Sequence, residues 1–136
     1  MIRRALLQAL LLMALAAVPA FVSGLVQVKK EEPLGPGEVR AATARQWGAA
    51  VLYVDARPKA RFDAGHIPGA VLLNEENWDD LFPAFSDAWE PEKTVVVYCD
   101  GGACEASQQV AARLREALQV NNVFVLKGGW PAWQRK

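Results

Sequence analysis

Two cysteines lie five positions apart, just beyond an apolar run of strand length. Cys99 directly follows the run 94–98, and Cys104 directly precedes a helical pattern that begins at Glu105. Backbone N–H groups in a tight turn, together with the positive end of a following helix, favour negative charge and so favour a thiolate. Because the thiolate is the nucleophilic form of cysteine, this pattern predicts a reactive Cys99.

The role of the second cysteine is open at the level of sequence. Cys104 can resolve a covalent bond formed at Cys99, pair with Cys99 in a disulfide, or pack as a small inert side chain. The glycines at 101 and 102 permit unusual backbone angles in the turn between the two cysteines. These angles would aim N–H groups at a negatively charged sulfur.

Strand-like and helix-like segments alternate after residue 37. Short apolar runs predict strands at 51–55, 70–73, 94–98 and 123–126, and helical patterns lie at 38–47, 78–85 and 105–118. This alternation predicts an α/β fold with a mostly parallel central sheet. Ligands of such sheets bind beyond the carboxyl ends of the strands, and the turn that carries Cys99 is such a place.

The amino-terminal segment differs in composition from the rest. It has no charged residue from Ala5 to Val28, follows two arginines, and as a helix would extend roughly 36 Å, enough to cross a membrane. A cleaved signal peptide is the alternative interpretation. We therefore expect a transmembrane anchor or signal at 1–28, a linker at 29–37 and one domain at 38–136. The domain would be exported to an extracytoplasmic space such as the periplasm, either membrane-anchored or, after cleavage, secreted.

Composition argues against two classes of function. Fifteen basic and fifteen acidic residues leave no net charge among the 136 residues, so no nucleic-acid partner is expected. With a single histidine and two cysteines, the chain has too few soft ligands for a protein-only metal site. We expect neither a metal nor an organic cofactor.

Three motifs resemble those of rhodanese-like domains. They are the segment 55–70, which includes Gly-His-Ile-Pro-Gly, the segment 96–99 with its glycine-bearing loop, and the segment 126–133 with Gly-Gly-Trp-Pro. The resemblance implies a single rhodanese-like domain, a central parallel sheet flanked by helices. It also implies a catalytic Cys99 at the head of an active-site loop made of Asp100, Gly101, Gly102, Ala103, Cys104 and Glu105.

The same resemblance implies a chemistry. Cys99 would take sulfur from a small sulfane-sulfur donor, become a persulfide, and pass the sulfur to a thiol or a protein acceptor without a cofactor. It gives a structural role to His66, in a turn before a strand, and places Asp55 and Arg57 in a buried polar network.

The loop departs from the family pattern in its charges. Many active members carry an arginine in this loop, whereas this chain has Asp100 and Glu105. We expect the two carboxylates to oppose an anionic donor, so activity with thiosulfate should be weak. The related dual-specificity phosphatases have a histidine at the position of Tyr98 and an arginine at the position of Glu105. A carboxylate at the second position cannot stabilise a transferring phosphoryl group, so we do not expect phosphatase activity of that type.

Three functional hypotheses follow from the sequence. The first is a sulfurtransferase or persulfide carrier that uses Cys99. The second is a thiol-disulfide or sulfur-redox module that cycles Cys99 with Cys104. The third is a rhodanese-like binding domain without catalysis.

Overall fold

A computed structural model describes residues 32–101 and 104–135. The expected anchor or signal at 1–28, residues 29–31 of the expected linker, and the loop residues Gly102 and Ala103 lie outside the described residues. Within the described part of the chain, no helix has the length and apolar character that crossing a membrane requires.

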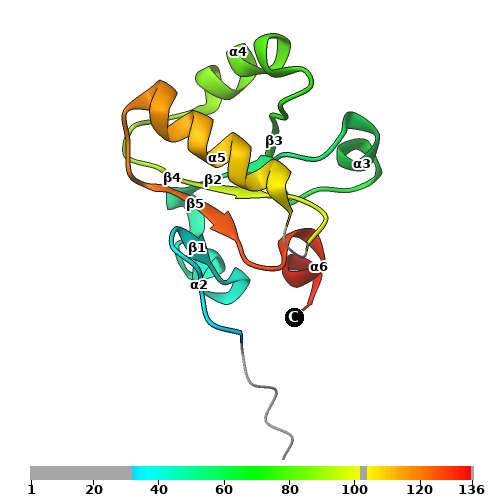
Figure 1. Ribbon diagram of the computed structural model, residues 1–136, viewed down its shortest axis with the longest axis vertical. Coiled ribbons are helices and arrows are strands. Elements are labelled where there is room, and N and C mark those ends of the chain that lie inside the picture. The colour runs from blue at the N-terminus through cyan, green and yellow to red at the C-terminus, as the bar shows by residue number, and fades with distance from the viewer. Residues whose placement is uncertain (1–31, 102–103, 136) are drawn as a thin grey trace, which may run out of the picture. The chain divides into compact units, whose positions relative to one another are not determined.

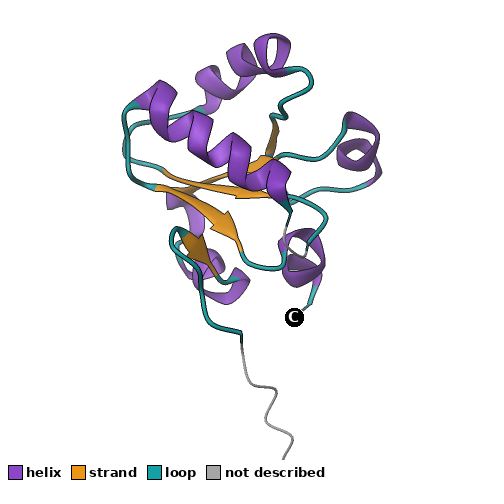
Figure 2. Ribbon diagram, in the orientation of Figure 1, coloured by secondary structure: helices purple, strands orange, loops and turns teal. Residues whose placement is uncertain are grey.

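Five parallel strands form one sheet in the order β1-β5-β4-β2-β3 (Figures 1 and 2). The strands are β1 (Glu38–Val39), β2 (Val51–Asp55), β3 (Val71–Leu72), β4 (Thr94–Tyr98) and β5 (Val123–Leu126). The helices are α2 (Ala41–Gln46), α3 (Lys59–Ala64), α4 (Trp78–Ala88), α5 (Glu105–Leu118) and α6 (Gly129–Gln134), with a 3-10 turn at Gly48–Ala50. The sequence-based prediction of a parallel α/β fold is confirmed.

Helices cover both faces of the sheet (Figure 2). On β4, Val95 and Val97 face the core beneath α4 and α5, whereas Val96 and Tyr98 face the core beside α2 and α6. Alternation along a strand sends successive side chains to opposite faces, and here both faces are buried. This explains why the run 94–98 is continuously apolar.

The first predicted element is partly wrong. The segment 38–47 was expected to be one helix, but Glu38–Val39 forms the edge strand β1 and the helix begins at Ala41. β1 pairs with β5, with Glu38 opposite Val125. A two-residue strand has no periodicity of its own, so only pairing with a distant strand produces it.

Other element boundaries differ by a few residues. The helix expected at 78–85 continues to Ala88 as α4 and accommodates Pro83. The strand expected at 70–73 is limited to Val71–Leu72. The strands at 51–55, 94–98 and 123–126 and the helix at 105–118 have the predicted bounds. The short helices α3 and α6 were not predicted.

Candidate active site

Cys99 lies at the centre of the sheet's carboxyl edge. It directly follows β4, the middle strand, and only 3% of its surface is exposed. Because all five strands are parallel, the segments after β2, β4 and β5 meet at this same edge. The edge brings together the three motifs that the sequence places far apart.

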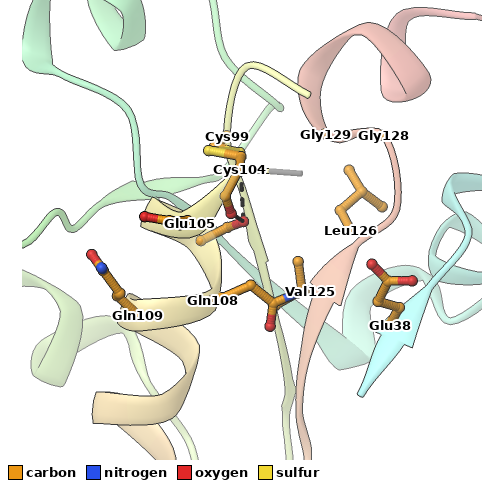
Figure 3. A pocket seen from close by; sticks show the side chains of 11 residues that line it. Glu38, Cys99, Cys104, Glu105, Gln108, Gln109, Val125, Leu126, Gly128 and Gly129 are labelled. Atoms are coloured by element: carbon orange, nitrogen blue, oxygen red, sulfur yellow. Dashed lines mark hydrogen bonds between the residues drawn. A yellow bond between two sulfur atoms is a disulfide. The ribbon is translucent and has the colours of Figure 1, made fainter. Parts of the chain in front are cut away.

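The second cysteine lies next to the first. Cys104 is the residue that precedes α5, and the structure joins it to Cys99 in a disulfide, with the two Cα atoms 6.5 Å apart (Figure 3). This Cα separation falls within the usual range for disulfides. Cys104 is partly exposed, in contrast to the buried Cys99.

Ser107, in the first turn of α5, contacts both cysteines. Its Oγ lies 3.5 Å from the Sγ of Cys99, and it donates a hydrogen bond of 3.1 Å to the carbonyl oxygen of Cys104. Ser107 is itself buried, with 2% of its surface exposed. When Cys99 is a thiolate, the single hydroxyl proton can turn to the sulfur, and the positive end of α5 adds to that stabilisation.

A cavity of about 520 Å³ opens beside the two cysteines (Figure 3). Its walls come from the start of α5, from β1, and from the end of β5 with the turn that follows. Glu105, Gln108 and Gln109 line the helix side, and Glu38 lines the side of β1. The side chains that line it include two acids and two amides, which suits an uncharged or cationic ligand better than an anion.

The sequence did not indicate Glu38 as a cavity residue. Its carboxylate accepts a 2.6 Å hydrogen bond from the N–H of Gly35 and pairs with the Nζ of Lys127 at 3.2 Å. The hydrogen bond from Gly35, followed by the neighbouring ammonium of Lys127, outweighs desolvation and lowers the pKa of Glu38 below its ordinary value. Glu38 is therefore a fixed negative charge at neutral pH.

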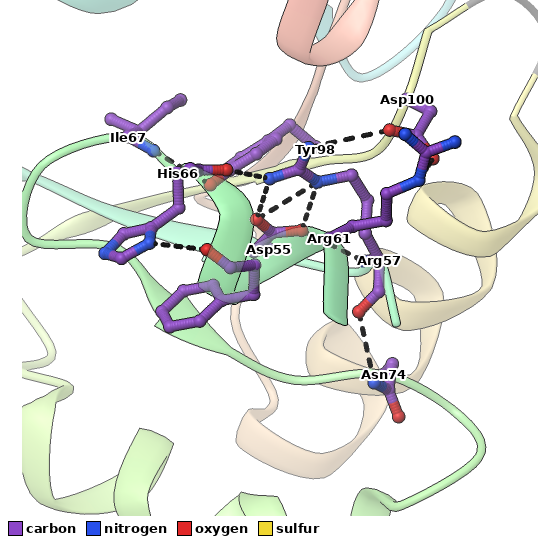
Figure 4. Close-up of polar contacts among 10 residues, drawn as sticks. Asp55, Arg57, Arg61, His66, Ile67, Asn74, Tyr98 and Asp100 are labelled. Carbon is purple, nitrogen blue, oxygen red and sulfur yellow. Dashed lines mark hydrogen bonds and ion pairs between the residues drawn. The ribbon is translucent and has the colours of Figure 1, made fainter. Parts of the chain in front are cut away.

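The carboxylate of Asp100 pairs with two arginines and is not among the groups that line the cavity. One carboxylate oxygen lies 3.5 Å from the Nη1 of Arg57 and the other 3.8 Å from the Nε of Arg61 (Figure 4). Two cations on the β2–α3 side thus balance the charge of Asp100. The expectation that the loop carboxylates oppose an anionic donor stays a prediction. Glu105 is the loop carboxylate that lines the cavity.

The buried network around Arg57 supports this edge of the site (Figure 4). Arg57 donates to both carboxylate oxygens of Asp55, at 2.9 and 2.7 Å, and to the carbonyl of Gly65 at 2.7 Å. Its guanidinium also lies near the faces of Tyr98 and Trp130, 5.5 and 5.1 Å from the ring centroids. The hydrogen bonds with Asp55 raise the pKa of Arg57 above its ordinary value, so this ion pair persists.

Tyr98 belongs to the same network and stays protonated. Burial raises the pKa of its hydroxyl far above the ordinary value, and a hydrogen bond with Asp55 adds to the effect. The hydroxyl oxygen accepts a 3.1 Å hydrogen bond from the N–H of Ile67. Tyr98 thus connects the strand that ends at the cysteine to the turn that carries the Gly-His-Ile-Pro-Gly motif.

His66 lies in this turn and is not among the residues that line the cavity. Its ring stacks on Phe62, with the centroids 3.8 Å apart, and its Nδ1 lies 2.9 Å from the carbonyl oxygen of Phe62. Because a carbonyl oxygen can only accept, Nδ1 carries the proton. These contacts join His66 to Phe62 near the end of α3.

The turn into α6 packs directly against the backbone of Cys99. The N–H of Trp130 donates a 2.7 Å hydrogen bond to the carbonyl of Cys99. A Cβ placed on Gly129 would collide with that carbonyl oxygen and would lie 2.7 Å from the nitrogen of Gly101. Gly129 also has a positive φ of 54°, so both its conformation and this close approach require glycine.

Comparison with known proteins identifies the fold. The family model for the rhodanese-like domain matches residues 38–136. The chain belongs to the rhodanese-like domain family. Its match spans every residue described here from β1 to α6, including the loop that begins at Cys99.

Solved structures agree with this assignment. The Alr3790 protein from Anabaena sp. is 30% identical, with 71% of this chain and 73% of that chain covered and a TM-score of 0.57. The BH2092 protein from Bacillus halodurans is 21% identical, with 88% and 80% covered and a TM-score of 0.59. A rhodanese-related protein from Thermoplasma volcanium is 19% identical, with 71% and 88% covered and a TM-score of 0.54. The last two similarities concern the fold alone.

A metal site finds no support in the described residues. Among them, no group of three or more His, Cys, Asp or Glu side chains is arranged to hold a metal ion.

Proposed function

We propose that this rhodanese-like domain is a sulfurtransferase that carries sulfane sulfur as a persulfide on Cys99. The observation that supports the proposal is the place of Cys99, buried at the end of the central strand, beside a cavity and the N-terminus of α5. A helix N-terminus and a nearby hydroxyl stabilise a thiolate and, after transfer, the negative terminal sulfur of a persulfide.

The proposed transfer has two steps. The Cys99 thiolate attacks the outer sulfur of a donor persulfide, so a bond forms between Sγ and that sulfur while the donor leaves as a thiolate. A thiol or protein acceptor then attacks the terminal sulfur of the Cys99 persulfide, takes it, and restores the Cys99 thiolate. Neither step needs a metal or an organic cofactor.

The disulfide form is inactive in this scheme, because Cys99 has no free thiolate while it is bonded to Cys104. A reductant must open the disulfide before sulfur can be accepted. The proposed location outside the cytosol rests on the apolar segment 1–28, and a disulfide is compatible with that location because oxidising compartments preserve such bonds.

The test uses the full chain in reduced form and cysteine persulfide as the donor. In a Cys104→Ser variant, intact-mass and peptide analysis should show one added sulfur, about 32 Da, on Cys99. The matched control is the double variant with Cys99→Ser, which should add none. Absence of added sulfur in the single variant would contradict sulfur transfer and would favour a binding domain without catalysis.

A further inference from the structure

The two cysteines form a reacting pair by geometry. They line the same cavity, and the structure bonds them while β4 and α5 keep their regular bounds. Cys104 can therefore reach the sulfur of Cys99 from the N-terminal position of α5, where a thiolate is favoured. This reach also exists when Cys99 carries a persulfide, because the inner sulfur of the persulfide is the same Sγ.

We propose that Cys104 resolves the Cys99 persulfide, so that the domain reduces sulfane sulfur to sulfide. This inference rests on the proposed function, since it needs the persulfide on Cys99. The terminal sulfur of the persulfide takes a proton from water. The Cys104 thiolate then attacks the Sγ of Cys99, the Sγ–Sγ bond forms, and the bond to the protonated terminal sulfur breaks to release hydrosulfide. The two cysteines lose two electrons, which the departing sulfur gains, and the product is the disulfide in the structure.

Intramolecular attack favours this step over transfer to a dilute acceptor. The attacking group is held beside its target, and well-oriented intramolecular reactions correspond to very high effective concentrations. The 3.1 Å hydrogen bond from Ser107 to the carbonyl of Cys104 fixes the backbone that carries the attacking sulfur. Ser107 thus contacts both the sulfur that is attacked and the residue that attacks it.

The difference in burial between the two cysteines indicates which sulfur a reductant attacks when it opens the disulfide. Cys99 is 3% exposed, whereas Cys104, the residue before α5, is partly exposed. A reductant with two thiols, either a small molecule or a protein, would therefore attack the sulfur of Cys104. Cys99 then leaves as a thiolate beside Ser107 and the start of α5, which stabilise it.

The complete cycle balances with a dithiol as the partner. A donor persulfide and a dithiol are consumed, and the donor thiol, sulfide and the disulfide of the reductant are produced. The second thiol of the reductant frees Cys104 from the mixed disulfide and returns the domain to its reduced form. The partner is thus a dithiol compound, or a protein with a pair of accessible cysteines.

A single-turnover experiment tests the resolving step. The full chain is reduced, freed of reductant, and mixed with one equivalent of cysteine persulfide, and sulfide and protein mass are followed. The wild type should release one sulfide per chain and end as the Cys99–Cys104 disulfide, about 2 Da lighter. Cys104→Ser and Cys104→Ala should both keep the added sulfur on Cys99 and release sulfide at least about tenfold more slowly.

The outcomes separate the two proposals. Added sulfur on Cys99 in both variants, with equal sulfide release by variants and wild type, would overturn the resolving role while leaving sulfur transfer intact. Absence of added sulfur in both variants would instead overturn sulfur transfer itself, and the resolving role with it. Agreement between the serine and alanine variants excludes an effect of the introduced hydroxyl.

A trapping experiment tests the direction of reopening. The oxidised wild type is treated with glutathione, quenched with iodoacetamide and mapped by peptide mass. Glutathione should be found on Cys104 and the alkyl group on Cys99. The reverse distribution would contradict the assignment of Cys104 as the attacked sulfur.

Discussion

At the scale of single residues, the charges of the residues near Cys99 bear on which donors the proposed sulfur transfer would use. Asp100 and Glu105 are both acidic and both belong to the loop, yet only Glu105 lines the cavity, because Asp100 pairs with Arg57 and Arg61. The wall of the cavity also includes the ionised Glu38. Because Lys127 pairs with Glu38, Glu105 is the carboxylate whose charge an anionic donor in the cavity would meet.

Replacing Glu105 should change the preference between donors. We expect Glu105→Gln to raise the rate of persulfide formation with thiosulfate about threefold, since it removes an exposed like charge near the doubly negative donor. The rate with cysteine persulfide should change less. The measurement is the initial rate with each donor at low salt in the Cys104→Ser background.

Glu116→Gln is the matched control for this prediction. Glu116 lies on the same helix as Glu105, is exposed, and is not among the residues that line the cavity beside the cysteines. It should leave the ratio of the two rates unchanged. An equal rise of the thiosulfate rate in both variants would show that the overall charge of the domain, not the position of Glu105, controls the preference between donors.

At the scale of elements, the loop that carries Cys99 is held by the turn between β5 and α6. The carbonyl of Cys99 accepts from the N–H of Trp130, and Gly129 makes the close approach that allows this bond. The position of Cys99, the proposed nucleophile, thus depends on an element some thirty residues later in the chain.

Gly129→Ala should therefore damage both stability and reactivity. The alanine adds the cost of a positive φ, about 1–2 kcal/mol, and its Cβ meets the backbone of Cys99 and Gly101, which cannot move without displacing the loop. We expect a loss of unfolding free energy above that φ cost and a clear fall in persulfide formation. Denaturant unfolding and the single-turnover mass measurement check the two effects.

The chain offers a matched control in Gly48. It has nearly the same φ, 55° against 54°, but a Cβ there would meet nothing within 4 Å. Gly48→Ala should lower the unfolding free energy only by the cost of the positive φ, about 1–2 kcal/mol, and should leave the proposed sulfur transfer unchanged. Equal losses of unfolding free energy in the two variants would mean that the close approach of residue 129 to Cys99 contributes nothing to the destabilisation.

At the scale of the whole domain, Glu38 ties the first edge strand to the turn after β5. Its carboxylate joins the N–H of Gly35 and the ammonium of Lys127. Its pKa is lowered on folding, so the ionised form contributes stability that is fully present above the ordinary pKa of 4.5. That contribution is lost as the pH falls through the lower pKa of the folded state.

Glu38→Gln should consequently destabilise the domain in a pH-dependent way. We expect a loss of about 1 kcal/mol of unfolding free energy at pH 7, the typical contribution of a charged hydrogen bond with a partly exposed partner. The difference from the wild type should shrink below pH 4.5. Denaturant unfolding at a series of pH values measures it.

Glu92→Gln serves as the control for this prediction, because Glu92 is an exposed glutamate in the segment before β4. It should leave the unfolding free energy nearly unchanged from pH 7 to pH 4. A pH-independent loss in Glu38→Gln would contradict the assigned role of the carboxylate.

Much of the fold follows from local pattern. The continuous apolar runs predict β2, β4 and β5, and the amphipathic pattern predicts α5 with its observed ends. The short elements β1, α3 and α6 could not be predicted in this way. β1 exists because it pairs with β5, and α6 begins where Gly129 meets the backbone of Cys99.

The sequence alone predicted the strand before Cys99, the helix after it and the rhodanese-like family, because motifs and periodicity are properties of neighbouring residues. It also led to the proposal that Cys99 is the nucleophile. Which charged groups lie near Cys99 became visible in the folded structure alone. It turned Asp100 to Arg57 and Arg61, and it brought Glu38 from the first strand into the cavity wall. The physical reason is that these contacts join distant segments at the common carboxyl edge of a parallel sheet, which no local pattern encodes.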